Sequence, residues 1–213
     1  MLKRIVKRLT VEAAAGFVLL TGVFMMTRYA GLSVSGTSVH IGKEKPVVVL
    51  DAGHGGNDPG KVGVDGSLEK DINLAITLKL KEYLEQSDVE VILTRDDDKG
   101  LYKSSDSSKK MADMKQRCQT IAETDPDIVV SVHQNSYHQE AISGGHVFYY
   151  KGSEKGKKLA EKIQKRFDYV LGEKNTRLAK ANDNYYLLLH VKCPIVIVEC
   201  GFLSNSSESK MLN

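Results

Sequence analysis

Two histidines and two glutamates supply the side-chain types that a catalytic zinc site needs. His54 lies among glycines at positions 53, 55, 56 and 60, directly after a short apolar run. His133 and Glu199 each end another apolar run, and Glu69 follows the glycine-rich segment. Two imidazoles and one carboxylate are a common ligand set for catalytic Zn²⁺, with a fourth position left open to water. The set predicts a hydrolytic centre with one Zn²⁺ per chain.

The two glutamates compete for the role of the carboxylate ligand. Glu199 ends an apolar run, where a lone ionised carboxylate must be paired, bound to metal or shifted in pKa. Glu69 falls in the first turn of a predicted helix, where an acid also simply complements the helix dipole. Zinc hydrolysis needs a nearby acid that is not itself a ligand. We assign His54, Glu69 and His133 as ligands and Glu199 as the general base, although spacing alone does not decide between the glutamates.

Apolar runs alternate with amphipathic segments through the chain. The runs predict strands at 47–50, 89–93, 127–133, 146–150 and 194–199, with a short one at 177–180. Helices are expected at 68–84, capped by Ser67, and at 111–123, 154–171 and 182–190, the last capped by Asn182. The first of these should bury a face made of Ile72, Leu74, Ala75, Leu78, Leu80 and Leu84.

This alternation predicts an α/β fold with a mixed, mostly parallel central sheet and helices on both faces. In such sheets, functional groups gather in the crevice outside the carboxyl ends of the strands. The candidate residues His54, His133 and Glu199 all follow or end apolar runs, so we expect them to meet at one mouth.

The positive charge of the chain is confined to its beginning. The formal net charge is +3, but residues 1–45 carry seven basic and two acidic side chains, so the remainder is slightly acidic. The folded part therefore offers no basic stripe for phosphates, and the sequence argues against a nucleic-acid partner.

The segment 1–32 has the pattern of an export signal. Basic residues precede an apolar stretch from Ala13 to Met26. Such a pattern keeps the amino terminus in the cytoplasm and sends the rest of the chain across the membrane. A retained membrane anchor is favoured over a cleaved signal peptide, because no clear small-x-small cleavage site follows. Residues 33–45 are expected to form a linker and residues 46–213 a single catalytic domain on the extracytoplasmic face of the membrane.

The three cysteines do not form a framework of disulfides. Cys118, Cys193 and Cys200 are an odd number, and the last two bracket one expected strand, which holds them too far apart to bridge. Free thiols are predicted.

A series of motifs resembles a known family in order along the chain. These segments are Asp51-Ala-Gly-His-Gly-Gly-Asn-Asp-Pro-Gly60, Glu69-Lys-Asp71, Thr94-Arg95, Ser131-Val-His-Gln-Asn135, Gly145-His-Val-Phe-Tyr-Tyr150 and Pro194-Ile-Val-Ile-Val-Glu-Cys-Gly-Phe-Leu-Ser-Asn205. They are similar to motifs of the zinc-dependent N-acetylmuramoyl-L-alanine amidases of bacterial cell walls, which implies a phosphorylase/hydrolase-like fold. The resemblance implies that His54, Glu69 and His133 bind zinc. It also implies that Glu199 moves protons while the amide between muramic acid and L-alanine is hydrolysed.

Four further residues concern the fit of the substrate. Arg95 is a candidate for contact with a substrate carboxylate, or else for an ion pair with a neighbouring acid, and Asn135 is a candidate for holding substrate. Lys61 and Gln134 stand where family members commonly have small residues. We expect both to flank the mouth, which leaves room for a zinc hydrolase acting on another peptide-like bond. A non-catalytic peptidoglycan-binding or scaffold protein with this fold is the other alternative.

The short chain without appended modules resembles the germination-specific members of the family from spore-forming bacteria. That resemblance implies spore-cortex peptidoglycan as substrate, between the two forespore membranes, with stem-peptide removal leading to muramic-δ-lactam. It also suggests an activating or localising protein partner, since no inhibitory helix or wall-binding module is present to restrain the enzyme.

Overall fold

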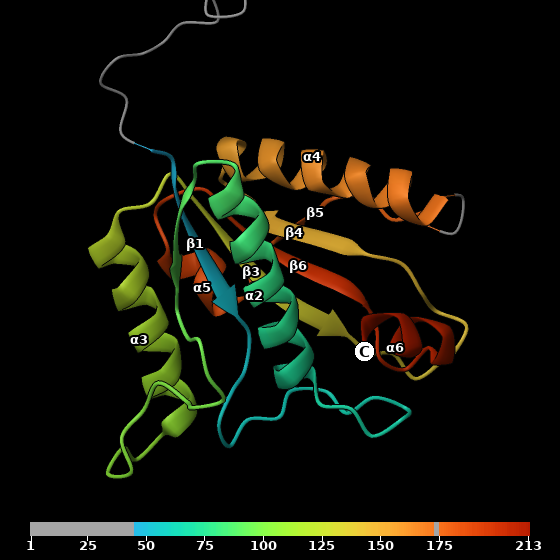
Figure 1. Ribbon diagram of the computed structural model, residues 1–213, viewed down its shortest axis with the longest axis horizontal. Helices are drawn as coiled ribbons and strands as arrows, with labels where there is room; N and C mark the ends of the chain where they lie inside the picture. The colour runs from blue at the N-terminus through green and yellow to red at the C-terminus, as the bar shows by residue number, and fades with distance from the viewer. Residues whose placement is uncertain (1–44, 173–174) are drawn as a thin grey trace, which may run out of the picture. The chain divides into compact units, whose positions relative to one another are not determined.

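The computed structural model describes residues 45–172 and 175–213, and it shows one sheet with helices on both sides (Figure 1). The predicted signal segment 1–32, and the linker up to residue 44, lie outside the described residues. The strands are β1 (Val47–Ala52), β2 (Glu90–Leu93), β3 (Ile128–Asn135), β4 (His146–Tyr150), β5 (Lys180–Asn182) and β6 (Ile195–Phe202). The helices are α2 (Glu69–Gln86), α3 (Lys109–Thr124), α4 (Glu154–Leu171), α5 (Tyr186–His190) and α6 (Ser206–Leu212).

The sheet is mixed, as its sequence pattern predicts. Its strand order is β2-β1-β3-β6-β4-β5. The first four strands in this order run parallel, and β4 pairs antiparallel with β6. The central strands are buried on both faces, which explains their nearly continuous runs of Val, Ile and Leu. Because β1, β3 and β6 are parallel, their carboxyl ends lie at one edge of the sheet.

Each face of the sheet has its own apolar core. On one face, α2 and α4 cover a cluster that includes Leu50, Val132 and Val198. On the other face, α3 and α5 pack against Val49, Val129 and their neighbours. Successive residues of a strand point to opposite faces, so these adjacent valines and leucines serve the two cores in turn. Figure 1 shows α2 and α4 together in front of the sheet.

Several details of the predicted elements were wrong. Helix α2 begins at Glu69 with no side-chain cap, so Ser67 is not its cap; the Ser67 hydroxyl donates to Asp65 instead. Its inner face contains Ile72, Asn73 and Thr77, whereas Ala75 and Leu78 are exposed. The predicted buried face was partly wrong because it was derived from apolar residues alone, whereas the actual buried face also includes polar side chains.

Strand and helix ends also differ from the predictions. β3 and β6 continue past His133 and Glu199, to Asn135 and Phe202, so these two site residues lie inside strands rather than at their last positions. Asn182 belongs to β5, and α5 begins only at Tyr186. The carboxyl-terminal helix α6 was not predicted; Asn205 caps it by accepting hydrogen bonds from the amides of Ser207 and Glu208.

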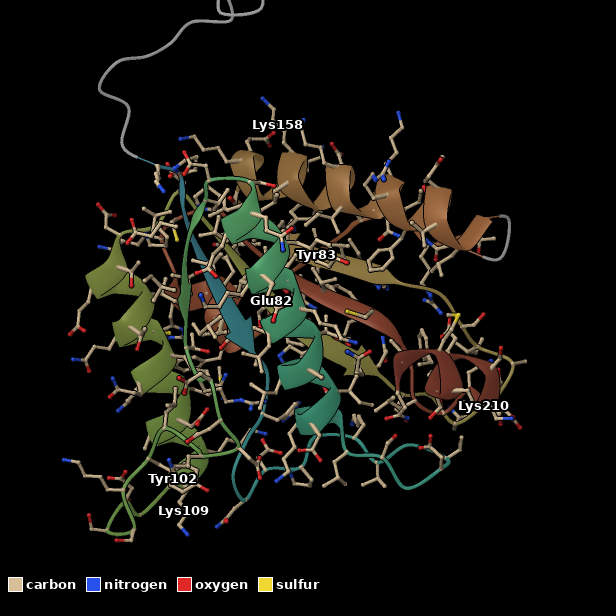
Figure 2. The ribbon with its side chains drawn as sticks, in the orientation of Figure 1. Glu82, Tyr83, Tyr102, Lys109, Lys158 and Lys210 are labelled. Carbon is tan, nitrogen blue, oxygen red and sulfur yellow. The ribbon has the colours of Figure 1, made fainter. Side chains whose placement is uncertain are left out.

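The outer faces of the helices are polar. Figure 2 shows Glu82 and Tyr83 on α2 and Lys158 on α4 directed away from the sheet. Among the described residues, none of the helices combines the length and apolar character needed to cross a bilayer. All three cysteines are free, as predicted.

Candidate metal centre and active site

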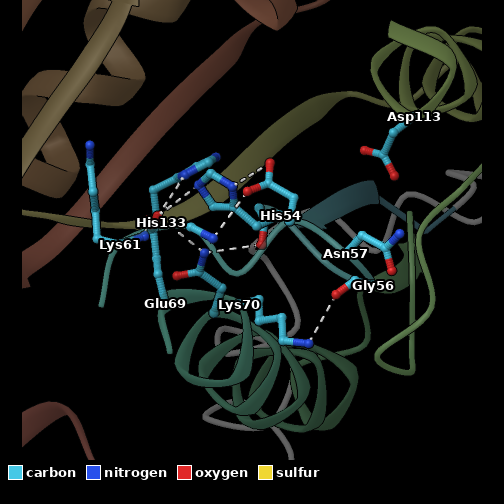
Figure 3. Close-up of polar contacts among 12 residues, drawn as sticks. His54, Gly56, Asn57, Lys61, Glu69, Lys70, Asp113 and His133 are labelled. Atoms are coloured by element: carbon cyan, nitrogen blue, oxygen red, sulfur yellow. Dashed lines mark hydrogen bonds and ion pairs between the residues drawn. The ribbon is translucent and has the colours of Figure 1, made fainter. Parts of the chain in front are cut away.

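His54, Glu69 and His133 converge at the carboxyl edge of the sheet (Figure 3). One ligand atom from each lies within 4.8 Å of the others. Glu69 Oε1 is 3.2 Å from His54 Nε2 and 3.0 Å from His133 Nδ1. The two imidazole rings meet edge to face, with centroids 5.0 Å apart. Three residues separated along the chain therefore present two ring nitrogens and a carboxylate to one point.

The loop after β1 holds His54 in an unusual backbone conformation. His54 has φ 63°, in the left-handed region that residues with a side chain seldom adopt. Asp58, four residues later, accepts a hydrogen bond from His54 Nδ1 at 3.0 Å. This bond fixes the tautomer and leaves Nε2 free to act as a ligand, which is the usual role of a carboxylate behind a metal-binding histidine.

Glu69 is almost fully buried, at 1% exposure. Its Oε1 accepts from the Gln134 amide at 3.1 Å, and its Oε2 from the Lys61 amide at 2.8 Å. Burial opposes ionisation, but the side-chain contacts with His133 and His54 outweigh it and hold the pKa of Glu69 well below its usual range. The carboxylate is thus ionised and oriented by the backbone of two separate segments.

Two glycines give room to the candidate ligands. A Cβ at Gly53 would lie 2.3 Å from the imidazole of His133. At Gly60, which has φ +69°, a Cβ would lie 2.6 Å from Glu69 Oε2 and 2.8 Å from His54 Cδ2. The glycine-rich stretch is therefore required by the packing of the backbone against the ligands.

A buried ion pair fastens the His54 loop to α3. Arg117 is 2.6 Å from Asp51 Oδ1, and both side chains are at most 2% exposed. The same guanidinium donates to the carbonyl oxygens of Ala52 and His54 at 2.7 and 2.6 Å. Asp51 also accepts from the hydroxyls of Thr94 and Ser131. The network ties the end of β1 to its neighbours and fixes where the loop begins.

Glu199 lies on the sheet beside His133, one of the three candidate ligands. It is the register partner of His133, and both point to the same face as Ser131 and Ile197. Its side chain is 6% exposed, and its Oε2 has no hydrogen-bond partner among the described residues. Burial raises the pKa of Glu199, and the negative charge of Glu69 adds to this, against the attraction of His133. A buried acid with an unpaired oxygen calls for a functional explanation.

Arg95 does not lie in the mouth. It is 4% exposed, and its guanidinium donates to the carbonyl oxygens of Ala52, Gly53, Lys70 and Asp97. This geometry argues against both expected interactions, the contact with a substrate carboxylate and an ion pair with a neighbouring acid. Backbone carbonyl oxygens accept four hydrogen bonds from the side chain, because the loop after β1 and the start of α2 lie around it.

The prediction that Gln134 flanks the mouth of the site was also wrong. Its side chain is 2% exposed and donates to Asn73 Oδ1 at 3.1 Å, beneath α2 rather than at the mouth. Strand alternation points it away from the face that carries His133. Lys61 is exposed at the rim and contributes its backbone amide to Glu69. Asn135 is half-buried at the end of β3, where its Oδ1 accepts from the Ser136 amide.

The donor set fits a zinc ion. Imidazole nitrogens and a carboxylate oxygen suit Zn²⁺, and three protein ligands leave a position for water, as catalytic zinc sites require. The buried, ionised Glu69 and the Asp58 carboxylate behind His54 are the features that such a site needs around its ligands. Glu199 stands beside the set rather than within it.

Two residues that contact the site were not predicted from the sequence. Asp58 lies four residues after His54, and its contact with the His54 ring was not expected from the sequence. Tyr185 donates a hydrogen bond from its hydroxyl to Glu199 Oε1 at 3.4 Å. It comes from the start of α5, and no spacing in the sequence indicates that it meets β6.

Residues 48–213 match the family model described as N-acetylmuramoyl-L-alanine amidase, and the chain belongs to this family of peptidoglycan hydrolases. The germination-specific N-acetylmuramoyl-L-alanine amidase of Bacillus subtilis is 36% identical over 169 residues, which are 78% of this chain and 70% of that protein.

Solved structures of two relatives share the fold. The CwlD amidase of Clostridioides difficile, solved in complex with the GerS lipoprotein, has a TM-score of 0.76 and 42% identity over 79% of this chain and 88% of its own. The catalytic domain of CwlV, an N-acetylmuramoyl-L-alanine amidase from Bacillus (Paenibacillus) polymyxa var. colistinus, has a TM-score of 0.67 and 32% identity, covering 78% and 86%. These likenesses confirm the predicted fold class.

Proposed function

We propose that this chain is a zinc-dependent amidase that cuts the amide between N-acetylmuramic acid and L-alanine in spore-cortex peptidoglycan. In this proposal His54, Glu69 and His133 hold the zinc, and Glu199 is the catalytic acid and base. The observation that carries the proposal is the convergence of the three ligand atoms within 4.8 Å, with the buried Glu199 as the register partner of His133.

Each residue has a separate task in the reaction. Zn²⁺ at this position would lower the pKa of a coordinated water towards neutrality and stabilise negative charge on the substrate carbonyl oxygen. Glu199 accepts the proton of the attacking water and later donates it to the departing amine of alanine. The raised pKa of Glu199, caused by burial, suits a carboxyl group that must carry a proton for part of the cycle.

Asn135 is proposed to hold the substrate. Its Oδ1 is engaged by the Ser136 amide, which turns the side-chain amide so that its NH₂ group remains available to a carbonyl of the stem peptide. Asn135→Ala should then raise KM with little effect on kcat. An unchanged KM in Asn135→Ala would show that Asn135 does not bind the substrate.

Product analysis tests the reaction. Purified peptidoglycan is digested with the full chain and with the Glu199→Ala variant, and the products are identified by mass spectrometry. The proposal expects free stem peptides that begin with L-alanine from the wild-type chain and none from Glu199→Ala. Cleavage at another bond would favour the alternative zinc hydrolase, and failure of folded, zinc-loaded wild-type chain to cut would favour the non-catalytic scaffold.

The cortex assignment and the partner are supported by the relatives. The B. subtilis relative is germination-specific, and the C. difficile relative was solved with a lipoprotein. We extend to this chain a cortex substrate on the path to muramic-δ-lactam, an extracytoplasmic location with residues 1–32 as signal anchor, and a protein partner that activates or localises the enzyme. Strong activity of the purified chain with zinc alone would refute a requirement for an activating partner.

A further inference from the structure

The carboxylate of Glu199 is held at only one of its two oxygens. Among the described residues, its single hydrogen bond comes from the hydroxyl of Tyr185, which is 3.4 Å from Oε1. The other oxygen, Oε2, is buried and has no partner. A carboxylate buried in this way is free to rotate about its last bond unless one oxygen is fixed, so the Tyr185 contact distinguishes two otherwise equivalent oxygens.

The ring of Tyr185 is held in place by aromatic packing. It packs edge to face against Phe148, with centroids 5.6 Å apart, and Phe148 in turn packs against His146 at 4.2 Å. His146 is the register partner of Glu199 on β4. The tyrosine therefore reaches Glu199 from the start of α5, and its ring has a packing contact with β4 that does not involve the hydroxyl.

The hydroxyl is a permanent donor towards the carboxylate. Burial raises the pKa of Tyr185 to about 12, and the negative charge of Glu199 contributes to this rise. The phenol consequently keeps its proton at neutral pH. An ionised carboxylate has no proton to give, so this hydrogen bond has one direction.

The geometry points to Tyr185 as a positioning residue for Glu199. Its hydroxyl holds Oε1, so that Oε2 is the oxygen that exchanges protons with water and with the departing amine. This inference rests on the proposed function of Glu199 and assigns a role to a residue outside the family motifs quoted above. Without the hydroxyl, the carboxylate spends part of its time in orientations that cannot accept the proton.

The Tyr185→Phe variant of the full, zinc-loaded chain tests the inference, because it removes the hydroxyl and keeps the ring against Phe148. We expect kcat to fall about tenfold, as for loss of a hydrogen bond to a charged group. KM should stay within about twofold, and zinc content and melting temperature should match the wild-type chain. The matched control is Tyr186→Phe, whose ring stacks on His190 with centroids 3.9 Å apart, and its kcat should be unchanged.

Three results would overturn the role of Tyr185. An unchanged kcat means that the hydroxyl does not act on Glu199. A raised KM with normal kcat means that it touches substrate instead, and a large fall in melting temperature means that its bond is structural. Wild-type chain that cuts no muramoyl-alanine bond would sink the proposed function itself, so the two failures are distinguishable.

A double-mutant cycle shows whether Tyr185 acts through Glu199. The Glu199→Asp variant shortens the carboxylate and draws it away from Tyr185. Adding Tyr185→Phe to it should cause little further loss of kcat, because the shared contact is already broken. A second tenfold loss in the double variant would show that Tyr185 acts independently of Glu199 and contradict the inference.

Discussion

Asp58 holds the proposed ligand His54 in a defined orientation. It lies 3.0 Å from His54 Nδ1, and the pKa of Asp58 is lowered, because the hydrogen bonds from His54 and from the Gly60 amide outweigh the opposing effect of burial. The bond keeps the proton on Nδ1 and aims Nε2 at Glu69. Metal-binding histidines depend on such partners for both orientation and basicity.

Removing this carboxylate should weaken zinc binding without unfolding the chain. For Asp58→Ala we expect zinc affinity to fall by about 10- to 100-fold, measured by competition with a chelating dye. Asp71→Ala is the control, since Asp71 is exposed in the first turn of α2 and should leave affinity unchanged. Equal affinities in wild-type and Asp58→Ala chains would show that Asp58 does not orient His54.

The glycine-rich loop after β1 and the ends of the strands together position the site. Glycines 60 and 66 both have positive φ, at +69° and +86°. A side chain at Gly60 would collide with Glu69 and His54, whereas nothing lies within 4 Å of a Cβ at Gly66. The two positions therefore separate the cost of backbone strain from the loss of space for the ligands.

Gly60→Ala and Gly66→Ala form a matched pair. Both should lower the free energy of unfolding by about 1–2 kcal/mol through left-handed backbone strain, measured by urea denaturation. Only Gly60→Ala should also lose zinc binding, because its Cβ displaces the ligands. If both variants kept full zinc affinity, the predicted collision at Gly60 would be disproved.

The Asp51–Arg117 pair links β1 to α3 and makes stability depend on pH. Arg117, Ser131 and Thr94 overcome the effect of burial and lower the pKa of Asp51 to about 2, from 3.8. Because the folded pKa is the lower one, the stabilisation is complete above pH 3.8 and is lost as the pH falls towards 2. The shift corresponds to about 2 kcal/mol.

Unfolding of the wild-type chain and Asp51→Asn in urea should reveal this dependence. At pH 6 the variant should be less stable by at least about 2 kcal/mol, since it also leaves Arg117 buried without its charged partner. The difference between the two chains should shrink as the pH is lowered from 4 towards 2. A difference that stays constant or grows in acid would contradict the assigned pKa.

The arrangement of strands and helices could be predicted from the sequence, whereas several side-chain contacts could not. Periodicity was sufficient to predict a mixed, mostly parallel sheet, since parallel central strands must be apolar on both faces. The same reasoning located His54, His133 and Glu199 along the chain. The positions of Arg95 and Gln134 were predicted wrongly. The spacing of apolar residues does not show that a polar side chain is buried when its hydrogen-bond partners are backbone atoms or residues distant in sequence.

The other contacts that were not predicted join residues far apart in the sequence. Tyr185 reaches Glu199 only because α5 packs on the face of the sheet from which Glu199 projects. The ion pair of Asp51 and Arg117 spans 66 positions of sequence. A single sequence predicts which strands and helices exist, but contacts of this kind depend on how the elements pack, and that became visible only in three dimensions.

Zinc content separates the proposed ligands from the proposed catalytic glutamate. Purified wild-type chain, His54→Ala and Glu199→Ala are each dialysed against a limited excess of zinc, and the bound metal is measured by atomic spectroscopy. We expect about one zinc per chain in the wild type and in Glu199→Ala, and a much lower content in His54→Ala. If Glu199→Ala lost zinc as His54→Ala does, Glu199 would be a ligand and the assigned division of roles would be wrong.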